Sequence, residues 1–179
     1  QTINLFPKAG EKRLDQWEKG WSKNLSDLES TLKINSITPG YFGKYEVLRW
    51  KHNFIKPVSK NFEKNSLAII QDWLFDKYMR DKSAVYEFGC GTGHNLLRVR
   101  NVNPFAEIWG LDWAISSQKI IRKLNSDQFS YNFKTHYFDF FAPDYSFNLK
   151  NNSVVYTSAA LEQVGNRYKK FIKFLLKKK

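Results

Sequence analysis

The chain has 179 residues, of which 42% are hydrophobic and 17% aromatic. This length supports one domain with a sizeable core, and the apolar content excludes an intrinsically disordered chain despite the formal net charge of +12. The positive charge makes an anionic partner such as RNA worth considering. The lysines are scattered along the sequence, however, which favours a generic basic surface over a dedicated nucleic-acid face.

Other composition features narrow the class further. Cys90 is the only cysteine, so no intrachain disulfide forms and nothing indicates an oxidising compartment. The histidines, at 52, 94 and 136, lack metal-ligand spacing, so we expect no metal site. No apolar run approaches the ~18 residues of a membrane span, and the first ten residues do not resemble a signal peptide. We therefore expect a cytoplasmic protein without a membrane partner.

The N-terminal third shows helical spacing of its apolar residues. Leucine and tryptophan recur at every third or fourth position between residues 11 and 32, which predicts one amphipathic helix. Asn65 or Ser66 can cap a second helix. We expect the residues that share its apolar face to be Leu67, Ile70, Leu74 and Tyr78.

The segment between these helices, residues 37–57, reads as an irregular loop. Pro39 and Gly40 mark a turn, and aromatic residues crowd the stretch that follows. Two interpretations stay open: a lid over a bound molecule, or a hydrophobic cluster under a long loop. The residues concerned are Tyr41, Phe42, Tyr45, Arg49 and Trp50.

Short apolar runs alternate with helical stretches after residue 82. This alternation implies βαβ units, hence an α/β fold with a parallel sheet covered on both faces. A four-stranded sheet of this kind would leave one edge exposed, unless the N-terminal segment covers it or the natural protein continues. The expected strands span 84–88, 107–111, 132–138 and 153–157, and the expected helices span 94–100, 115–125 and 165–177.

The stretch "VYEFGCGTGHNLL" follows the first predicted strand directly. Its glycines, Gly89, Gly91 and Gly93, permit a sharp turn and close approach of a ligand, which the N–H groups of the next helix would face. A tight turn without a ligand is the alternative, although such a turn rarely needs three glycines. The stretch lacks a phosphate-loop ending, and His94 stands where a dinucleotide fingerprint has its third glycine. Glu87 would repel a pyrophosphate, so we expect a ligand that carries positive charge.

The spacing of this stretch resembles the first motif of the class I S-adenosylmethionine-dependent methyltransferases, Asp/Glu-x-Gly-x-Gly-x-Gly. Glu87 and the three glycines match its defined positions, and the resemblance covers roughly residues 83–177. It implies S-adenosylmethionine as the cofactor and a Rossmann-like three-layer α/β/α fold with a mostly parallel sheet. We accordingly expect a helical N-terminal cap or lid segment, residues 1–82, followed by a cofactor-binding domain, residues 83–179.

The same resemblance implies roles for residues that follow the later strands. Asp112, 19 residues after Gly93, would hold the ribose hydroxyls beside Trp113, and its alternative is a helix N-cap. Asp139 would meet the adenine next to Phe140, or is an ordinary turn residue. The residues expected to bind the cofactor are Glu87, Phe88, Gly89, Cys90, Gly91, Gly93, Asp112, Trp113, Asp139, Phe140 and Ser158.

After the fourth strand, "TSAALEQVG" occupies the position where this family lines its methyl-transfer site. Ser158, Ala159 and Glu162 are the candidates there, and Glu162 is the candidate catalytic residue unless it is only a first-turn helix acid. The implied chemistry is attack of a nucleophile on the methyl group of the sulfonium. This reaction needs positioning above all, and a base such as Glu162 or His136 only if the nucleophile must lose a proton.

The acceptor is less specified than the cofactor. The family's sheet has seven strands and this sequence supplies the first four, so we expect a truncated chain or a short form in which the acceptor half is largely missing. The segment after the fourth strand also resembles some bacterial sugar and small-molecule O-methyltransferases. We favour a small-molecule acceptor such as a sugar hydroxyl. An RNA methyltransferase and a noncatalytic cofactor-binding module stay open as alternatives, and the oligomeric state is undetermined.

Overall fold

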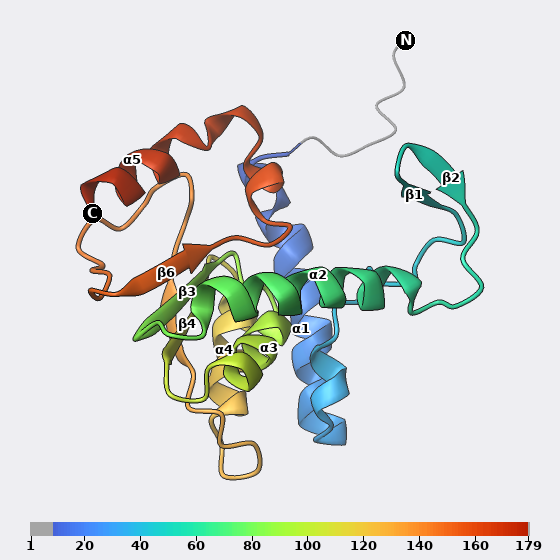
Figure 1. Cartoon of the computed structure of the whole chain (residues 1–179), viewed down its shortest axis with the longest axis horizontal. Helices are drawn as coiled ribbons and strands as arrows, with labels where there is room; N and C mark the ends of the chain where they lie inside the picture. Colours follow the sequence, from blue (N-terminus) through green and yellow to red (C-terminus); the bar gives the residue numbers. More distant parts are fainter. Residues whose placement is uncertain (1–8, 179) are drawn as a thin grey trace.

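The computed structural model describes residues 9–178 and contains a four-stranded parallel sheet within them (Figure 1). The strands lie in the order β5-β4-β3-β6, so the chain crosses from one edge of the sheet to the other after β5. The predicted α/β class with a mostly parallel sheet is confirmed. The strands are β3 (Ala84–Phe88), β4 (Glu107–Asp112), β5 (Lys134–Tyr137) and β6 (Ser153–Tyr156).

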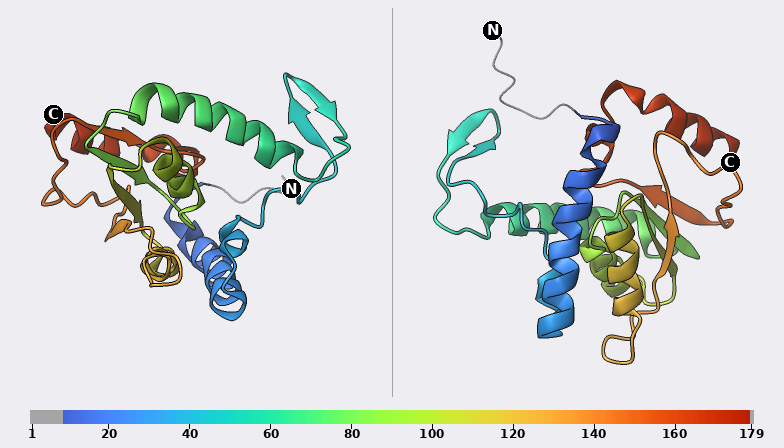
Figure 2. Two further views of the ribbon diagram at one scale, coloured as in Figure 1. Left: turned by 60° about the horizontal axis from the view of Figure 1, so that its bottom comes forward. Right: turned by 180° about the vertical axis from the view of Figure 1, so that it is seen from behind.

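Helices pack against both faces of this sheet (Figures 1 and 2). The helices of one face carry the core that includes Val85, and the last helix packs on the opposite face against Phe88. The helices are α1 (Leu14–Thr31), α2 (Phe62–Met79), α3 (His94–Val102), α4 (Ile115–Leu124) and α5 (Lys169–Lys177), with short 3-10 turns η1 (Glu11–Arg13), η2 (Ile34–Ile37) and η3 (Leu161–Arg167).

Strand β3 is buried along its whole length because both faces of the sheet are covered. Its side chains alternate: Val85 belongs to the core on the α1–α4 side, whereas Tyr86 and Phe88 belong to the core on the α5 side. Glu87 falls on the same side as Val85 and is 0% exposed. A carboxyl group therefore lies within the central strand of the domain.

The connection from β5 to β6 contains turns in place of a helix, and it covers part of the α5 face of the sheet. Phe147 from this loop packs edge-on against Tyr86 and Trp109 and stacks on His136 with ring centroids 4.6 Å apart. The loop also places Lys150 beside the first residue of β4. Aromatic rings of this loop and of the strands therefore cover this part of the α5 face of the sheet.

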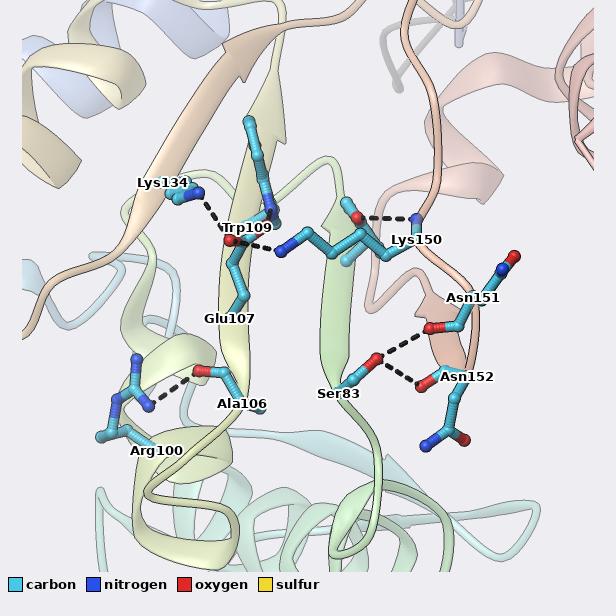
Figure 3. Close-up of polar contacts among 10 residues, drawn as sticks. Ser83, Arg100, Ala106, Glu107, Trp109, Lys134, Lys150, Asn151 and Asn152 are labelled. Carbon is cyan, nitrogen blue, oxygen red and sulfur yellow. Dashed lines mark hydrogen bonds and ion pairs between the residues drawn. The ribbon is translucent and has the colours of Figure 1, made fainter.

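A polar cluster fastens this loop to the sheet (Figure 3). The Glu107 carboxylate accepts hydrogen bonds from Lys134 Nζ at 2.5 Å, Lys150 Nζ at 2.8 Å and Trp109 Nε1 at 2.7 Å. Partial burial works against the charged carboxylate, but these donors outweigh it and lower the pKa of Glu107 to about 2. The cluster joins β4, β5 and the loop before β6.

The N-terminal helix shares the core of the sheet. Trp21 and Leu28 of α1 are buried in the same cluster as Val85, and α1 packs along α4. The Glu18 carboxylate accepts a hydrogen bond from Ser116 N at 3.0 Å, at the first turn of α4. The predicted helix between residues 11 and 32 is confirmed, and the domain boundary at residue 82 stays a prediction.

Helix α2 differs from its prediction. It begins at Phe62, before the expected caps, and its buried residues are Ala68, Gln71, Phe75 and Met79. Ile70 and Tyr78, which we expected on the buried face, are 49% and 52% exposed. The physical reason is that α2 carries apolar residues on two sides, so that periodicity alone does not select the face that packs.

The segment 37–57 is more regular than predicted. It contains an antiparallel hairpin of β1 (Leu48–Trp50) and β2 (Asn53–Ile55), which extends beyond the end of α2 (Figures 1 and 2). Its turn residues, Lys51 and His52, have φ of 45° and 71°. Such two-residue turns are usually Asn-Gly or Asp-Gly, and Lys51-His52 therefore did not indicate a hairpin.

The C-terminal helix begins later than predicted. Gly165 has φ 63° and ψ −136°, which breaks the helical path inside η3, and α5 starts only at Lys169. Among residues 9–178, no helix is both long and apolar enough to cross a membrane.

The contact between Glu18 and α4 gives a test of how α1 is attached. We expect Glu18→Ala to lower the free energy of unfolding by about 1 kcal/mol, because the N-terminus of α4 loses a charged acceptor. Urea denaturation at pH 7 measures this change. The exposed Glu29 lies on the same helix, so Glu29→Ala is the matched control. Equal effects of the two substitutions would contradict the attachment.

Candidate functional site

An open cavity of about 710 Å³ lies at the carboxyl ends of β3 and β6. The strand order reverses between these two strands, and ligands of open α/β sheets bind at such a point. The cavity is lined by Trp17, Trp21, Pro39, Tyr41, Glu87, Gly89, Cys90, Gly91, Thr92, His94, Asn95, Asp112, Trp113, Phe140, Phe141, Ser158, Ala159, Ala160, Gln163 and Val164.

The glycine loop after β3 forms the floor of this cavity. Gly89, Gly91 and Gly93 have φ of 77°, 54° and 75°, a region that side-chain-bearing residues rarely adopt. A Cβ at Gly89 would collide with Ala160, and one at Gly91 would lie 2.9 Å from the ring of Trp21. Both the conformation and the close approach of neighbouring segments therefore require glycine here.

Asp112, the last residue of β4, holds the glycine loop in place. One carboxylate oxygen accepts a hydrogen bond from Gly91 N at 2.8 Å, and the other accepts one from Ala114 N at 2.9 Å. Burial raises the pKa of Asp112 to about 6, although hydrogen bonds from Ala114, Gly91 and Trp113 oppose this shift. The side chain thus joins the loop to the start of α4 and faces the cavity.

Glu87 is the acid on the opposite side of the glycine loop. Its Oε1 accepts a hydrogen bond from Asn95 Nδ2 at 2.6 Å, whereas its Oε2 has no hydrogen-bond partner among the described residues. Burial raises the pKa of Glu87 to about 8, although hydrogen bonding from Asn95 and from the neighbouring Tyr156 hydroxyl opposes this shift, so the carboxyl group is mostly protonated at pH 7. A buried polar atom left without a partner points to a ligand that would complete its contacts.

His94 lies at the same end of the cavity as Glu87, at the start of α3. Its Nδ1 is buried without a hydrogen-bond partner among residues 9–178, and Phe42 packs edge-on against the ring. Burial, together with the nearby Arg98 and Lys64, lowers the pKa of His94 to about 4. The imidazole is therefore neutral at pH 7 and able to accept a proton.

The first part of helix α1 lies beside η3 (Figure 1), and residues of both elements line the cavity. Trp17 and Trp21 stack with centroids 5.3 Å apart and line the cavity. The 3-10 turn η1, directly before α1, is tied to η3 by an ion pair between Arg167 and Glu11 and by a hydrogen bond from Arg13 to Gln163. Sequence reasoning missed the two tryptophans, because their spacing indicates only an amphipathic helix and not what that helix covers.

The structure brings most of the predicted cofactor residues together. Those that line the cavity are Glu87, Gly89, Cys90, Gly91, Asp112, Trp113, Phe140 and Ser158, and the candidate Ala159 lies with them.

Other predicted residues lie apart from the cavity lining. Phe88 points into the core on the α5 side, and Gly93 caps the start of α3. Asp139 accepts a hydrogen bond from Phe141 N at 2.7 Å, as a turn residue does. Glu162 is exposed, and His136 pairs with Asp144 on the opposite face of the sheet. Their roles in binding or catalysis stay predictions.

No protein-family model and no curated sequence matches this chain. Among solved structures, the [4+2]-cyclase SpnF superposes with a TM-score of 0.56 at 17% identity, over 95% of this chain and 57% of that one. This likeness concerns the fold alone. It agrees with the predicted Rossmann-like α/β fold.

Two further solved structures have lower TM-scores, and no argument rests on them. PKMT2 from Rickettsia typhi in complex with AdoHcy gives 0.48 at 21% identity, over 60% of this chain and 22% of that one. The plantazolicin methyltransferase BpumL in complex with SAH gives 0.44 at 12% identity, over 94% and 57%. The chain spans 57% or less of the length of each of these three proteins.

The raised pKa of Glu87 predicts how stability depends on pH. Between its ordinary value of 4.5 and its folded value of about 8, the folded protein binds more protons than the unfolded chain. The free energy of unfolding therefore falls as the pH rises through this window. We expect Glu87→Gln to be more stable than the wild type at pH 8.5, by roughly a few kcal/mol, and about equal at pH 5.

Thermal or urea unfolding at both pH values measures this difference. Glu107→Gln is the control, because the pKa of Glu107 is lowered and the opposite sign follows. That variant should be destabilised at pH 7, and the loss should disappear as the pH falls towards 2. A stability profile of Glu87→Gln that runs parallel to that of the wild type would show that Glu87 ionises normally.

Proposed function

We propose that this chain binds S-adenosylmethionine in the cavity beyond β3 and β6, as the cofactor-binding part of a methyltransferase for small molecules. The observation that carries the proposal is the unpartnered Oε2 of Glu87, buried behind a glycine loop. Once ionised, an acid at this position repels polyphosphate ligands and attracts a cation. S-adenosylmethionine offers two positive groups, the sulfonium and the amino group.

The remaining contacts fit the other half of such a ligand. Asp112 faces the cavity, and each of its oxygens already accepts one backbone N–H. A carboxylate oxygen can accept a second donor, so ribose hydroxyls are compatible with the contacts present. Trp113 packs against Phe141 with centroids 5.6 Å apart and offers an aromatic wall for the adenine.

When bound, the cofactor would supply a methyl group on a sulfonium that is already activated for displacement. The protein's own contribution is to orient the two reactants and to exclude water, which can lower the barrier by on the order of 7–11 kcal/mol in well-oriented systems. The tryptophan pair of α1 and the segment 161–167 cover the cavity and serve this purpose.

A small molecule is the acceptor that the lining of the cavity favours. Its walls near Glu87 include Pro39, Tyr41 and Ser158, which suit a compact acceptor such as a sugar hydroxyl. If the nucleophile must lose a proton, His94 lines the cavity as a neutral imidazole, but its pKa of about 4 makes it a weak base at pH 7. Glu162 would need to turn inward from its exposed position to act.

RNA is the second candidate acceptor, and the net charge of +12 is the observation that favours it. It predicts affinity for RNA that falls by orders of magnitude between roughly 50 and 200 mM salt. Absence of RNA binding at low salt would remove this candidate.

Binding of the cofactor is tested by thermal unfolding. We expect both S-adenosylmethionine and S-adenosylhomocysteine to raise the melting temperature, because each binds only the folded protein; at 100 times the dissociation constant the gain is about 2.7 kcal/mol. Asp112→Asn should reduce the shift strongly, since the amide leaves one acceptor fewer at the loop.

The matched control is Asp144→Asn, which makes the same change on the opposite face of the sheet and should leave the shift intact. A wild-type melting temperature that does not move at millimolar ligand would contradict the proposed function.

A further inference from the structure

Three buried side chains form a hydrogen-bonded row behind the cavity. Gln71 from α2 is 6% exposed and Asn95 from α3 is 3% exposed, and both lie on the same side of the sheet as Glu87. Gln71 Nε2 donates to Asn95 Oδ1 at 3.0 Å, and Asn95 Nδ2 donates to Glu87 Oε1 at 2.6 Å. Gln71 Nε2 also donates to Ser158 Oγ, with 3.1 Å between the nitrogen and the oxygen.

The structure gives this row one direction. The amide nitrogen of Gln71 donates, and Asn95 turns its oxygen towards Gln71 and its NH₂ group towards Glu87. Oε1 of Glu87 is then committed as an acceptor and cannot carry the proton of the carboxyl group. A proton, or a bound cation, is left with Oε2, the oxygen that has no partner among the described residues.

The groups around Glu87 supply no competing positive charge. Tyr156 faces it from β6, Asp112 from β4, Cys90 from the glycine loop and Tyr41 from the segment after η2. Burial raises the pKa of Tyr156, Cys90 and Tyr41, so all three are neutral at pH 7, and Asp112 is an acid. A positive charge beside Oε2 must therefore come with the ligand.

We propose that Gln71 and Asn95 are positioning residues that couple binding of the cationic cofactor to release of the proton on Glu87 Oε2. As the cation enters, the proton leaves for solvent and Asn95 stabilises the carboxylate through Oε1. Gln71 keeps Asn95 from flipping its amide. The inference rests on the proposed function and specifies how the same site recognises charge.

The coupling predicts that S-adenosylmethionine binds more tightly as the pH rises towards 8, by up to about tenfold per pH unit, with release approaching one proton. Adenosine, which lacks both cationic groups, should bind without pH dependence or proton release above pH 7, where Asp112 is ionised. Calorimetric titrations between pH 6 and 8.5, in two buffers of different ionisation enthalpy, measure affinity and proton release together.

Gln71→Met keeps the volume of the side chain and removes its donors. Asn95 is then free to flip, the carboxylate loses its donor, and ionisation of Glu87 moves to higher pH. We expect the affinity of this variant for S-adenosylmethionine at pH 7 to be about tenfold lower than that of the wild type. The difference between the two proteins should narrow as the pH rises. Adenosine binding should be unchanged. Glu87→Gln should bind S-adenosylmethionine without pH dependence or proton release.

Gln118→Met is the matched control, because Gln118 is a buried amide of similar exposure whose nitrogen donates to the carbonyls of Asp112 and His136. It makes the same chemical change outside the row and should keep the proton release of the wild type. Asn95→Ser gives a second variant if Gln71→Met does not fold, with the same expected shift.

Two outcomes overturn the inference and are distinguishable from each other. If the wild type binds S-adenosylmethionine without releasing a proton, or if Gln71→Met keeps the wild-type pH dependence, the coupling fails while the cofactor assignment stands. If the wild type binds adenosine but not S-adenosylmethionine at any pH, the proposed function fails as well.

Discussion

The burial of one carboxyl group, that of Glu87, is the constraint around which the site is arranged. An acid within the central strand of a parallel sheet loses its hydration, and a charged form without a partner would destabilise the fold by several kcal/mol. The protein keeps the group neutral and gives one oxygen a donor, Asn95, while the other stays without a partner among the described residues. A buried carboxyl group of this kind lowers the stability of the fold, as is common for residues that serve function.

The elements around this group are held together by contacts with one another. Asp112 binds the glycine loop from β4, Trp21 packs on it from α1, and Gln71 reaches it from α2 through Asn95. The loop therefore has contacts from segments that are far apart in sequence. A preformed cavity of this kind lowers the entropy that a ligand would lose on binding.

Features that depend on neighbouring residues in the chain were predicted well from the sequence. Features that depend on which helix face packs against which partner were predicted poorly. Strand β3, the glycine turn and the start of α3 are encoded within a dozen residues, and the structure has them as expected. Trp17 and Trp21 fitted a generic amphipathic helix, and nothing local states that this helix covers the cavity. Helix α2 was placed on the wrong face because Ile70 and Gln71 reverse the usual order, with an apolar residue outside and an amide within.

The most direct test of the central claim is a crystal structure of the complex with S-adenosylhomocysteine. The account predicts the ligand inside the cavity, with its adenosine between Asp112 and Trp113 and its amino-acid end towards Glu87. An empty cavity with the ligand bound elsewhere, or an adenosine that lies against Glu87, would contradict it.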